Sequence, residues 1–195
     1  MVGVGILSCI LGVSTAWVVT RYDFFGKNFF EWALLLPAAV PAYIIAYTYT
    51  DFLESAGPVQ KIIRDFFNFQ NADQYWFPEL RSMEGAIFVM SFVLYPYIYM
   101  TTRASFLTVP ISFFQTSLIY GRSSFFSVAL PLARPGIIAG LALVLMETVS
   151  DFGTVEYFAL ETLTLGVFNV WLGMNRLSGD SQISSVFFVF FIFLF

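Results

Sequence analysis

The amino-acid sequence predicts an all-α integral membrane protein, a polytopic bundle of about five transmembrane helices. Hydrophobic residues make up 58% of the 195-residue chain, and only 11% of its residues are charged. Soluble domains carry about 25% charged residues, so this chain has less than half of the usual charge. Its uncharged runs are long enough to cross a bilayer and alternate with charged segments. Together these observations place the chain in the membrane class.

The first predicted span covers residues 1–20, which contain no charged side chain before Arg21. Its length matches the roughly 20 apolar residues that a helix needs to cross the hydrocarbon core. Gly12 and Ala16 form a small-xxx-small pair within it. Small residues at this spacing permit close contact with a neighbouring helix.

A short loop at 21–31 leads to the second uncharged run, 32–50, which contains Pro37 and Pro41. Prolines at this depth remove backbone hydrogen bonds and kink or break a helix. Membrane proteins tolerate such breaks where neighbouring groups satisfy the freed backbone. The pattern fits a broken helix that lines a pathway and equally a kink that serves packing.

Residues 51–84 are rich in charge and are predicted to form an external loop with one short helix near 58–68. Trp76-Phe77-Pro78 is a candidate anchor at the membrane interface. The uncharged run 85–102 follows and ends at Arg103. Its length and composition predict the third span.

The next uncharged stretch, 104–121, is too polar for a good spanning helix. Its polar and helix-breaking residues are Ser105, Thr108, Pro110, Ser112, Gln115, Thr116 and Ser117. We therefore assign 103–135 to a folded surface loop and 136–150 to the fourth span. Residues 152–180 are predicted to be a second external loop, and 181–195 the opening of a fifth span. Because the last run, FFVFFIFLF, has no flanking charge or turn, we expect the chain to be a fragment or a truncated product.

The charges support this arrangement. The segments 21–31 and 103–134 together carry five Lys/Arg and two acidic residues. The segments 51–84 and 151–180 carry four Lys/Arg and ten acidic residues. Cytoplasmic loops of membrane proteins are enriched in Lys and Arg. The loop 103–135, with three arginines and no acid, is therefore predicted to face the cytoplasm.

This loop is predicted to contain two helical pieces, 111–120 and 123–130. Gly121 permits a sharp change of direction between them. Pro131 and Pro135 are expected to end the second piece and to set how the chain re-enters the bilayer. The apolar side chains of the loop have two possible destinations: the membrane surface, or a groove on another protein that accepts a short amphipathic helix.

The loop resembles the EAA loop of ABC-importer permeases. The family pattern runs Glu-Ala-Ala, then Leu-Gly, then Leu-Pro with a further proline and an isoleucine. The matching positions here are Gln115, Thr116, Ser117, Tyr120, Gly121, Leu130, Pro131, Pro135 and Ile137. Gln115 stands in the place of the family's glutamate and retains hydrogen-bonding capacity without the charge. The resemblance assigns these residues, with Arg122, to coupling with an ATPase.

The flanking segments 34–58, 75–82 and 129–158 closely resemble the amino-terminal half of permeases in the iron(III) class of binding-protein-dependent importers. Members of this class are typically double-length, with two homologous halves. The resemblance implies that 1–195 is a permease domain, incomplete at its C-terminus, with the MetI-like importer fold. Permeases for thiamine, sulfate, polyamines and phosphonate share much of this frame and are the alternatives to iron(III).

The resemblance also implies the partners. They are a cytoplasmic ABC ATPase dimer, a periplasmic solute-binding protein, a second permease half or subunit, and the lipid of a bacterial inner membrane; nucleic acid is not among them. The chain itself is expected to be a transport subunit, not an enzyme, and to bind no cofactor or metal. ATP and Mg would be bound by the ATPase, whose closure would move the loop and switch the spans between inward and outward access.

Two acids near the exit of the fourth span are candidates for the solute pathway or for docking. Glu147 and Asp151 are four residues apart and would share one helical face. Carboxylates inside a membrane segment often mark function, and oxygen ligands suit a hard cation. The structural alternative is that both reach the interface, or cap the next turn. Glu156, Tyr157 and Glu161 are candidate contacts for the solute-binding protein, or simply a solvated external face.

Several function classes lack the residues that they require. The chain has no histidine and one cysteine, Cys9, so an internal disulfide and imidazole chemistry are excluded. The Walker A pattern is also absent, because Gly26-Lys27 is followed by Asn28. A secondary transporter would share the broken helices and membrane acids but would not need the Gly, Leu-Pro and Pro loop. Nothing in the sequence resembles the selectivity filter of an ion channel.

Overall fold

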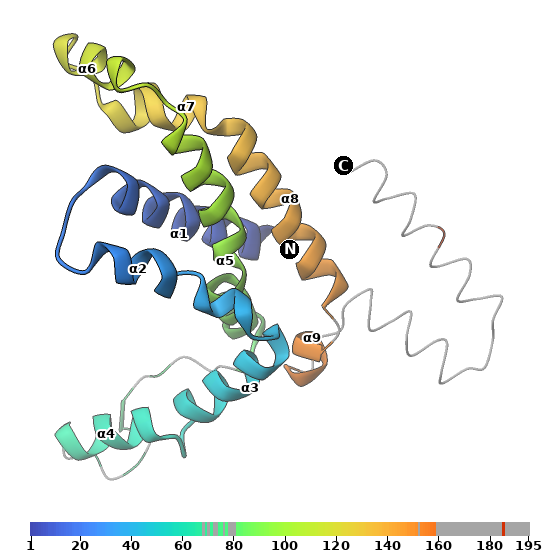
Figure 1. Cartoon of the computed structure of the whole chain (residues 1–195). Helices are drawn as coiled ribbons and strands as arrows, with labels where there is room; N and C mark the ends of the chain where they lie inside the picture. Colours follow the sequence, from blue (N-terminus) through green and yellow to red (C-terminus); the bar gives the residue numbers. More distant parts are fainter. Residues whose placement is uncertain are drawn as a thin grey trace. The chain divides into compact units, whose positions relative to one another are not determined.

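The computed structural model of the chain describes residues 1–67, 69, 71, 74, 75, 77, 81–151, 153–158 and 185, and every regular element among them is helical (Figure 1). The predicted all-α class is therefore confirmed over this part of the chain. Trp76 and Pro78 of the proposed anchor, Glu161, most of the loop 152–180 and nearly all of the predicted fifth span lie outside the described residues.

The described residues group into two compact units. The first comprises Met1–Ile45 and Ile87–Thr148. It contains four whole helices, α1 (Val2–Arg21), α2 (Lys27–Ala33), α6 (Ile111–Ile119) and α7 (Leu130–Leu132). It also contains most of α5 (Met83–Leu107) and most of α8 (Arg134–Ser150). The second comprises Ala46–Ala86 and the described residues from Val149 onward, with most of α3 (Ala42–Leu53), α4 (Pro58–Phe67) and α9 (Gly153–Tyr157).

In the first unit, α1 packs closely on α5 through small residues. A Cβ added at Gly12 would lie 2.8 Å from the Ile98 Cβ, and Ala16 is fully buried. The close helix contact predicted at these two positions is therefore present. Two buried serines add polar contacts between the same helices, since the Ser8 hydroxyl donates to the Ser91 carbonyl at 3.4 Å. Small residues and interhelical hydroxyl bonds are the usual means of helix association in lipid.

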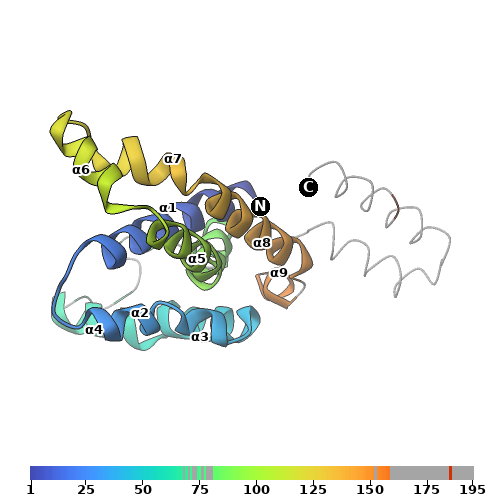
Figure 2. The same ribbon diagram turned by 45° about the horizontal axis from the view of Figure 1, so that its top comes forward.

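Helix α8 approaches α5 even more closely. A Cβ at Gly140 would lie 2.7 Å from the Ile98 Cα, and a Cβ at Gly136 would lie 2.7 Å from the Thr101 carbonyl oxygen. Real Cβ atoms are not found this close to backbone atoms, so only glycine fits at either position. The two views show α8 running beside α5 (Figures 1 and 2). The predicted span 136–150 is present as a helix that begins two residues earlier, at Arg134.

The segment 21–31, predicted as a loop, is partly helical because α2 begins at Lys27. Gly26 adopts the left-handed conformation (φ +85°) at the start of this helix. The second predicted span is broken, not kinked. After α2 the chain forms a 3-10 turn, η1 (Leu36–Ala39), and Val40 is extended because the following residue is Pro41. A new helix, α3, then begins at Ala42.

In the second unit, the predicted short helix near 58–68 is confirmed as α4. Arg81 connects the end of α3 to α9 in this unit. Its Nε lies 3.2 Å from Glu54, and its guanidinium carbon lies 5.6 Å from the ring centre of Tyr157. The Tyr157 ring also meets Tyr47 edge-on, with ring centres 5.6 Å apart. These contacts hold the short helix α9 against the end of α3.

Within the described residues, two helices are long and apolar enough to cross a membrane, namely Val2–Arg21 and Met83–Leu107. The number rises to four if each of two bent pairs forms one span. These pairs are Lys27–Ala39 with Ala42–Phe67, and Phe125–Leu132 with Arg134–Ser150. The helix α5 extends beyond the predicted third span, 85–102, at both ends and runs through Arg103 to Leu107.

Gly140→Ala is expected to lower the thermal unfolding midpoint of the purified chain in detergent. The added methyl group would press on the α5 backbone, and overpacking of this kind costs typically about 1–3 kcal/mol. Gly5→Ala is the matched control, because its Cβ would meet only the Leu141 and Leu145 methyl groups, at 3.3 and 3.4 Å. Equal midpoints for the two variants would contradict the close α5–α8 contact.

Candidate functional site

The loop 103–135 forms a compact cap at one end of α5 and α8. After α5 ends at Leu107, α6 runs from Ile111 to Ile119, and a short π-helical turn, η3 (Phe125–Ala129), continues into α7. Both views show α6 beside the η3–α7 segment at this end (Figures 1 and 2). The two predicted helical pieces, 111–120 and 123–130, are therefore present, although the second is largely a π-helix.

Gly121 ends α6 in the left-handed conformation, with φ +64°. Its N–H donates to the Leu118 carbonyl (3.0 Å), and the Arg122 N–H donates to the Ser117 carbonyl (2.9 Å). These two bonds form a Schellman motif, which requires a left-handed residue at the position of Gly121. The predicted change of direction is confirmed. An added Cβ at Gly121 would meet nothing within 4 Å, so the requirement for glycine comes from the backbone alone.

Trp17 of α1 anchors the loop to the bundle. Its ring centre lies 5.6 Å from Phe106 at the end of α5, 6.1 Å from Phe114 of α6, and 5.1 Å from Phe125 of η3. The guanidinium carbon of Arg21, one turn further along α1, lies 5.4 Å from the Phe114 ring centre. Aromatic contacts at these distances add to the energy of burial. Trp17 therefore joins α6 and η3 to α1 and to the end of α5.

The two halves of the loop are also joined by a pair of hydroxyl groups. The Ser117 Oγ lies 2.8 Å from the Ser124 Oγ across the turn at Gly121, and Ser117 is buried. On the outer side, a groove of about 580 Å³ lies between α6 and η3. Its lining residues are Ser112, Phe113, Thr116, Ser117, Tyr120, Arg122, Ser127 and Val128. No acidic residue is among them.

The structure thus brings four of the predicted coupling residues, Thr116, Ser117, Tyr120 and Arg122, to one groove. Gln115 is exposed on α6 and is not among the residues that line the groove. The residue that stands in the place of the glutamate of the EAA pattern is therefore accessible from outside.

The remaining coupling candidates come after the groove residues in the sequence, and one prediction about them is wrong. They are Leu130, Pro131 and Pro135. Pro131 does not end the second helical piece, because it is the second residue of α7, which continues to Leu132. Pro135 likewise lies in the first turn of α8 and does not stop a helix. Proline is tolerated at the start of α8 because the first N–H groups of a helix have no intrahelical partner, whereas Pro131 directly follows the π-helical turn η3. Leu130 is half-buried at the start of α7.

Only one of the two predicted pathway acids lies within α8. Glu147 lies in α8 and is half-buried, with no ion pair to any described residue. Asp151 follows the last residue of that helix, so the expectation of a shared helical face is wrong. Its Oδ1 instead accepts a hydrogen bond from the Thr154 N–H (3.0 Å) at the start of α9, which is the capping role. Glu156 is exposed, while Tyr157 is half-buried in the contacts with Arg81 and Tyr47.

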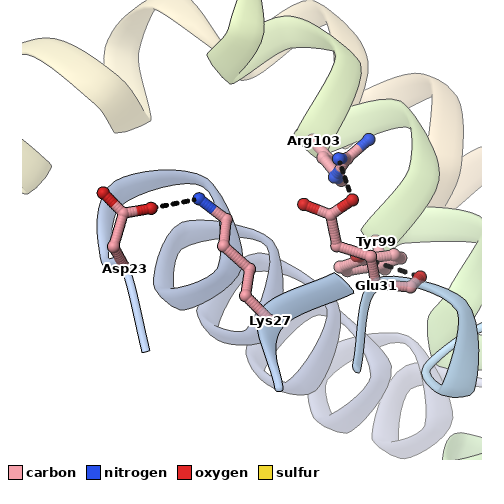
Figure 3. A network of polar contacts seen from close by, with 5 residues as sticks. All are labelled: Asp23, Lys27, Glu31, Tyr99 and Arg103. Carbon is pink, nitrogen blue, oxygen red and sulfur yellow. Dashed lines mark hydrogen bonds and ion pairs between the residues drawn. The ribbon is translucent and has the colours of Figure 1, made fainter. Parts of the chain in front are cut away.

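Sequence reasoning missed a polar network that fixes α2 on α5 (Figure 3). The Arg103 Nη2 lies 3.0 Å from the Glu31 Oε2, and both side chains are largely buried. The Tyr95 hydroxyl donates to the Leu34 carbonyl at 3.0 Å. Lys27 pairs locally with Asp23 at 2.9 Å. Because Glu31 and Arg103 are 72 residues apart in the sequence, no local pattern could have paired them.

These contacts place 21–31 and the loop 103–135 at the same end of the first unit, as the charge distribution predicts. No cluster of three or more His, Cys, Asp or Glu side chains that could hold a metal ion occurs in the described part of the chain. What the described residues of the site do form is a groove between α6 and η3 and an aromatic cluster that joins the loop to α1 and α5.

Comparison with known proteins gives the family of the chain. The family described as "Binding-protein-dependent transport system inner membrane component" matches residues 8–195. The chain is 28% identical to the molybdenum transport system permease protein ModB of Haemophilus influenzae, over 80% of this chain and 67% of that protein. It is 26% identical to the Fe(3+)-transport system permease protein FbpB 2 of the same organism, over 86% of this chain and 29% of that protein.

A third relative is the sulfate transport system permease protein CysT of Synechococcus elongatus. It is 30% identical over 76% of this chain and 51% of that protein. The chain thus spans between 29% and 67% of the length of these three relatives. All three are permease proteins by name, and their names cover three different solutes.

Trp17→Ala is expected to loosen the loop and to accelerate tryptic cleavage after Arg122, which is exposed. Loss of a large buried aromatic side chain costs about 3–5 kcal/mol, and Trp17, being half-buried, should lie near the lower end. Trp32→Ala is the control, because that side chain is 75% exposed. The same cleavage rate in both variants would show that Trp17 does not hold the loop.

Proposed function

Because the chain belongs to the family of binding-protein-dependent transport system inner membrane components, we propose that it is the transmembrane permease part of an ATP-driven importer. In this proposal the loop 103–135 couples the helical bundle to a cytoplasmic ABC ATPase. The chain carries no nucleotide-binding loop of its own, so ATP and Mg are bound by the ATPase. A solute-binding protein and a second permease half complete the assembly in a bacterial inner membrane.

The observation that carries this proposal is the outer surface of the loop. Large apolar side chains stand exposed around the groove, and Ile119 reaches 82% exposure. The members of this surface are Ile111, Phe113, Leu118, Ile119, Tyr120 and Phe126. Exposed apolar patches of this kind mark interaction sites. The patch lies on a short helix, as expected for a segment that enters a groove on a partner.

Charge supports a protein partner over the membrane surface for this patch. Arg122 lines the groove, Arg134 is exposed just beyond α7, and the loop contains no acid. The groove also presents the hydroxyls of Ser112, Thr116 and Tyr120. A partner with acidic and hydrogen-bonding groups around an apolar cleft would complement this mixture.

The mechanism is a rigid-body transfer of motion. When the ATPase moves α6, Trp17 carries the displacement to α1, and the continuous chain carries it through η3 and α7 to α8. Only glycine fits where α8 meets α5, so the helices there must move together or separate at that contact. A bistable contact of this type suits alternating access.

For the solute, iron(III) is the first candidate and a tetrahedral oxyanion the second. Among the three relatives, the Fe(3+) permease matches the largest share of this chain, 86%. Glu147, half-buried in α8, would attract a cation and repel an anion. The names of the other two relatives favour molybdate or sulfate.

Gly121→Pro is expected to abolish co-purification of the ATPase and uptake while leaving membrane insertion unchanged. Proline cannot adopt φ +64° and cannot donate to Leu118, so the Schellman motif is lost. Gly121→Asn is the control, because asparagine enters the left-handed region at low cost. Full ATPase co-purification with the proline variant would overturn the coupling role of the loop.

Uptake of labelled iron(III), molybdate and sulfate by cells that produce the transporter decides the solute. We expect ATP-dependent iron(III) uptake that falls on Glu147→Gln, since the neutral amide attracts a cation less. ATP-dependent uptake of an oxyanion instead would reject iron(III) and keep the importer. Uptake that continues without ATP, driven by an ion gradient, would reject the importer in favour of a secondary transporter.

A further inference from the structure

Helix α4 (Pro58–Phe67) has an inverted arrangement of polar and apolar faces. Ile62, Phe66 and Phe67, together with Val59 and Ile63, fall on one side of the helix by the 100° rotation per residue. The first three of these are among the most exposed apolar side chains of the described residues, and Phe66 is 79% exposed. A helix of a soluble protein would turn such a face toward its core.

The polar side of α4 is attached to the protein through Gln60 and Arg64, while Lys61 and Asp65 on the same side are exposed. Gln60 is 5% exposed, its Nε2 donates to the Leu53 carbonyl at 2.7 Å, and its Oε1 accepts a hydrogen bond from the Tyr75 hydroxyl at 2.6 Å. Arg64, on the same side, donates to that hydroxyl at 3.2 Å. These bonds set the rotation of α4 about its own axis, so the apolar face is held outward.

The direction of α4 is also set where it leaves α3. Gly57 is buried, and its N–H donates to the Glu54 carbonyl at 2.7 Å. A Cβ at Gly57 would lie 2.8 Å from the carbonyl carbon of Phe52 and closer still to the carbonyl oxygens of Asp51 and Phe52. The turn therefore packs backbone against backbone, and α4 begins five residues after the apolar helix α3 ends (Figure 1).

We propose that the apolar face of α4 lies in the interfacial region of the lipid bilayer, with the helix parallel to the membrane plane. The occupant of the face is the upper acyl-chain region of the membrane into which the preceding helix is inserted. Contact of this kind fixes the depth of the loop 51–84 at the surface. It depends on the membrane fold and not on the solute or the ATPase.

Two features favour lipid over a protein partner. The first is continuity, because α3 is apolar and belongs to a helix pair that could form a broken span, and the buried turn at Gly57 sets the direction in which α4 leaves α3. The second is composition, since α4 combines strong amphipathicity with low overall hydrophobicity, as interfacial helices do. Lys61 is exposed on the polar side, where its ammonium group can meet lipid headgroups.

The test places a fluorescent label on α4 in the assembled transporter, reconstituted in nanodiscs of phosphatidylcholine and phosphatidylglycerol. Cys9, the chain's single cysteine, is first changed to alanine, and then Phe66→Cys or Asp65→Cys is introduced. Phe66 lies on the apolar face, and its exposed neighbour Asp65 on the polar side is the control. Lipids with a nitroxide near the head of the acyl chain serve as the quencher.

We expect quenching by these lipids to be at least about twofold stronger for Phe66→Cys than for Asp65→Cys, because interfacial helices bury their apolar face about 5–10 Å into the boundary region. A water-soluble quencher should give the reverse order. Equal lipid quenching at both positions would overturn the proposal. Protection of Phe66→Cys that appears only when the solute-binding protein is added would also overturn it, because the face would then be a protein interface.

Discussion

The described first unit depends on the backbone contact of α8 and α1 with α5. In lipid, apolar side chains gain nothing by leaving one hydrocarbon environment for another, so helices associate by van der Waals contact and by a few hydrogen bonds. Glycines at positions 12, 136 and 140 allow α5 to be approached to within contact of backbone atoms. The energy of such an interface rises steeply when the helices are displaced, so the interface does not deform gradually. This stiffness lets a displacement at one end of a helix reach the other.

The role proposed for the loop 103–135 depends on this stiffness. Its Schellman turn, the Ser117–Ser124 hydroxyl pair and the Trp17 cluster make it a small rigid body attached to three helices. A flexible loop with the same exposed apolar surface would change shape when a partner pushed on it, and would not transmit the movement. In the function we propose, the same surface on a rigid cap would transmit the movement of the ATPase to the helices. The Glu31–Arg103 pair and Tyr95 add α2 to the same body.

The two units use polar groups in different ways. In the first, serine and tyrosine hydroxyls join helices whose outer surfaces meet lipid. In the second, Gln60, Arg64 and Tyr75 hold α4 by its polar side and leave Ile62, Phe66 and Phe67 facing outward. In both units large apolar side chains are exposed, so the usual rule that apolar faces point inward does not hold for these surfaces.

The sequence by itself determined the class of the protein and much of its organisation. Low charge required a membrane environment, run lengths located α1, α5 and α8, and Gly121 marked the turn because only a few residues accept a left-handed backbone. It also predicted α4. These features are local: each depends on composition or on residues within one or two helical turns. The element boundaries predicted from the sequence differ from the structure at the start of α2, at Arg103 and at Pro131. There, tertiary contacts or the position within a helix outweighed the local signal.

Only the tertiary structure decided which residues meet. Glu31 and Arg103, Trp17 and Phe125, and Gly140 and Ile98 are distant in sequence, and no periodicity links them. The helix α8 ends before Asp151, so this residue caps α9 and does not share a helix with Glu147. The tertiary structure also left the apolar face of α4 exposed. A pattern of residues specifies which face of a helix is apolar. What that face contacts follows from the packing of the whole chain, because contact energies exist only between groups that the fold has brought together.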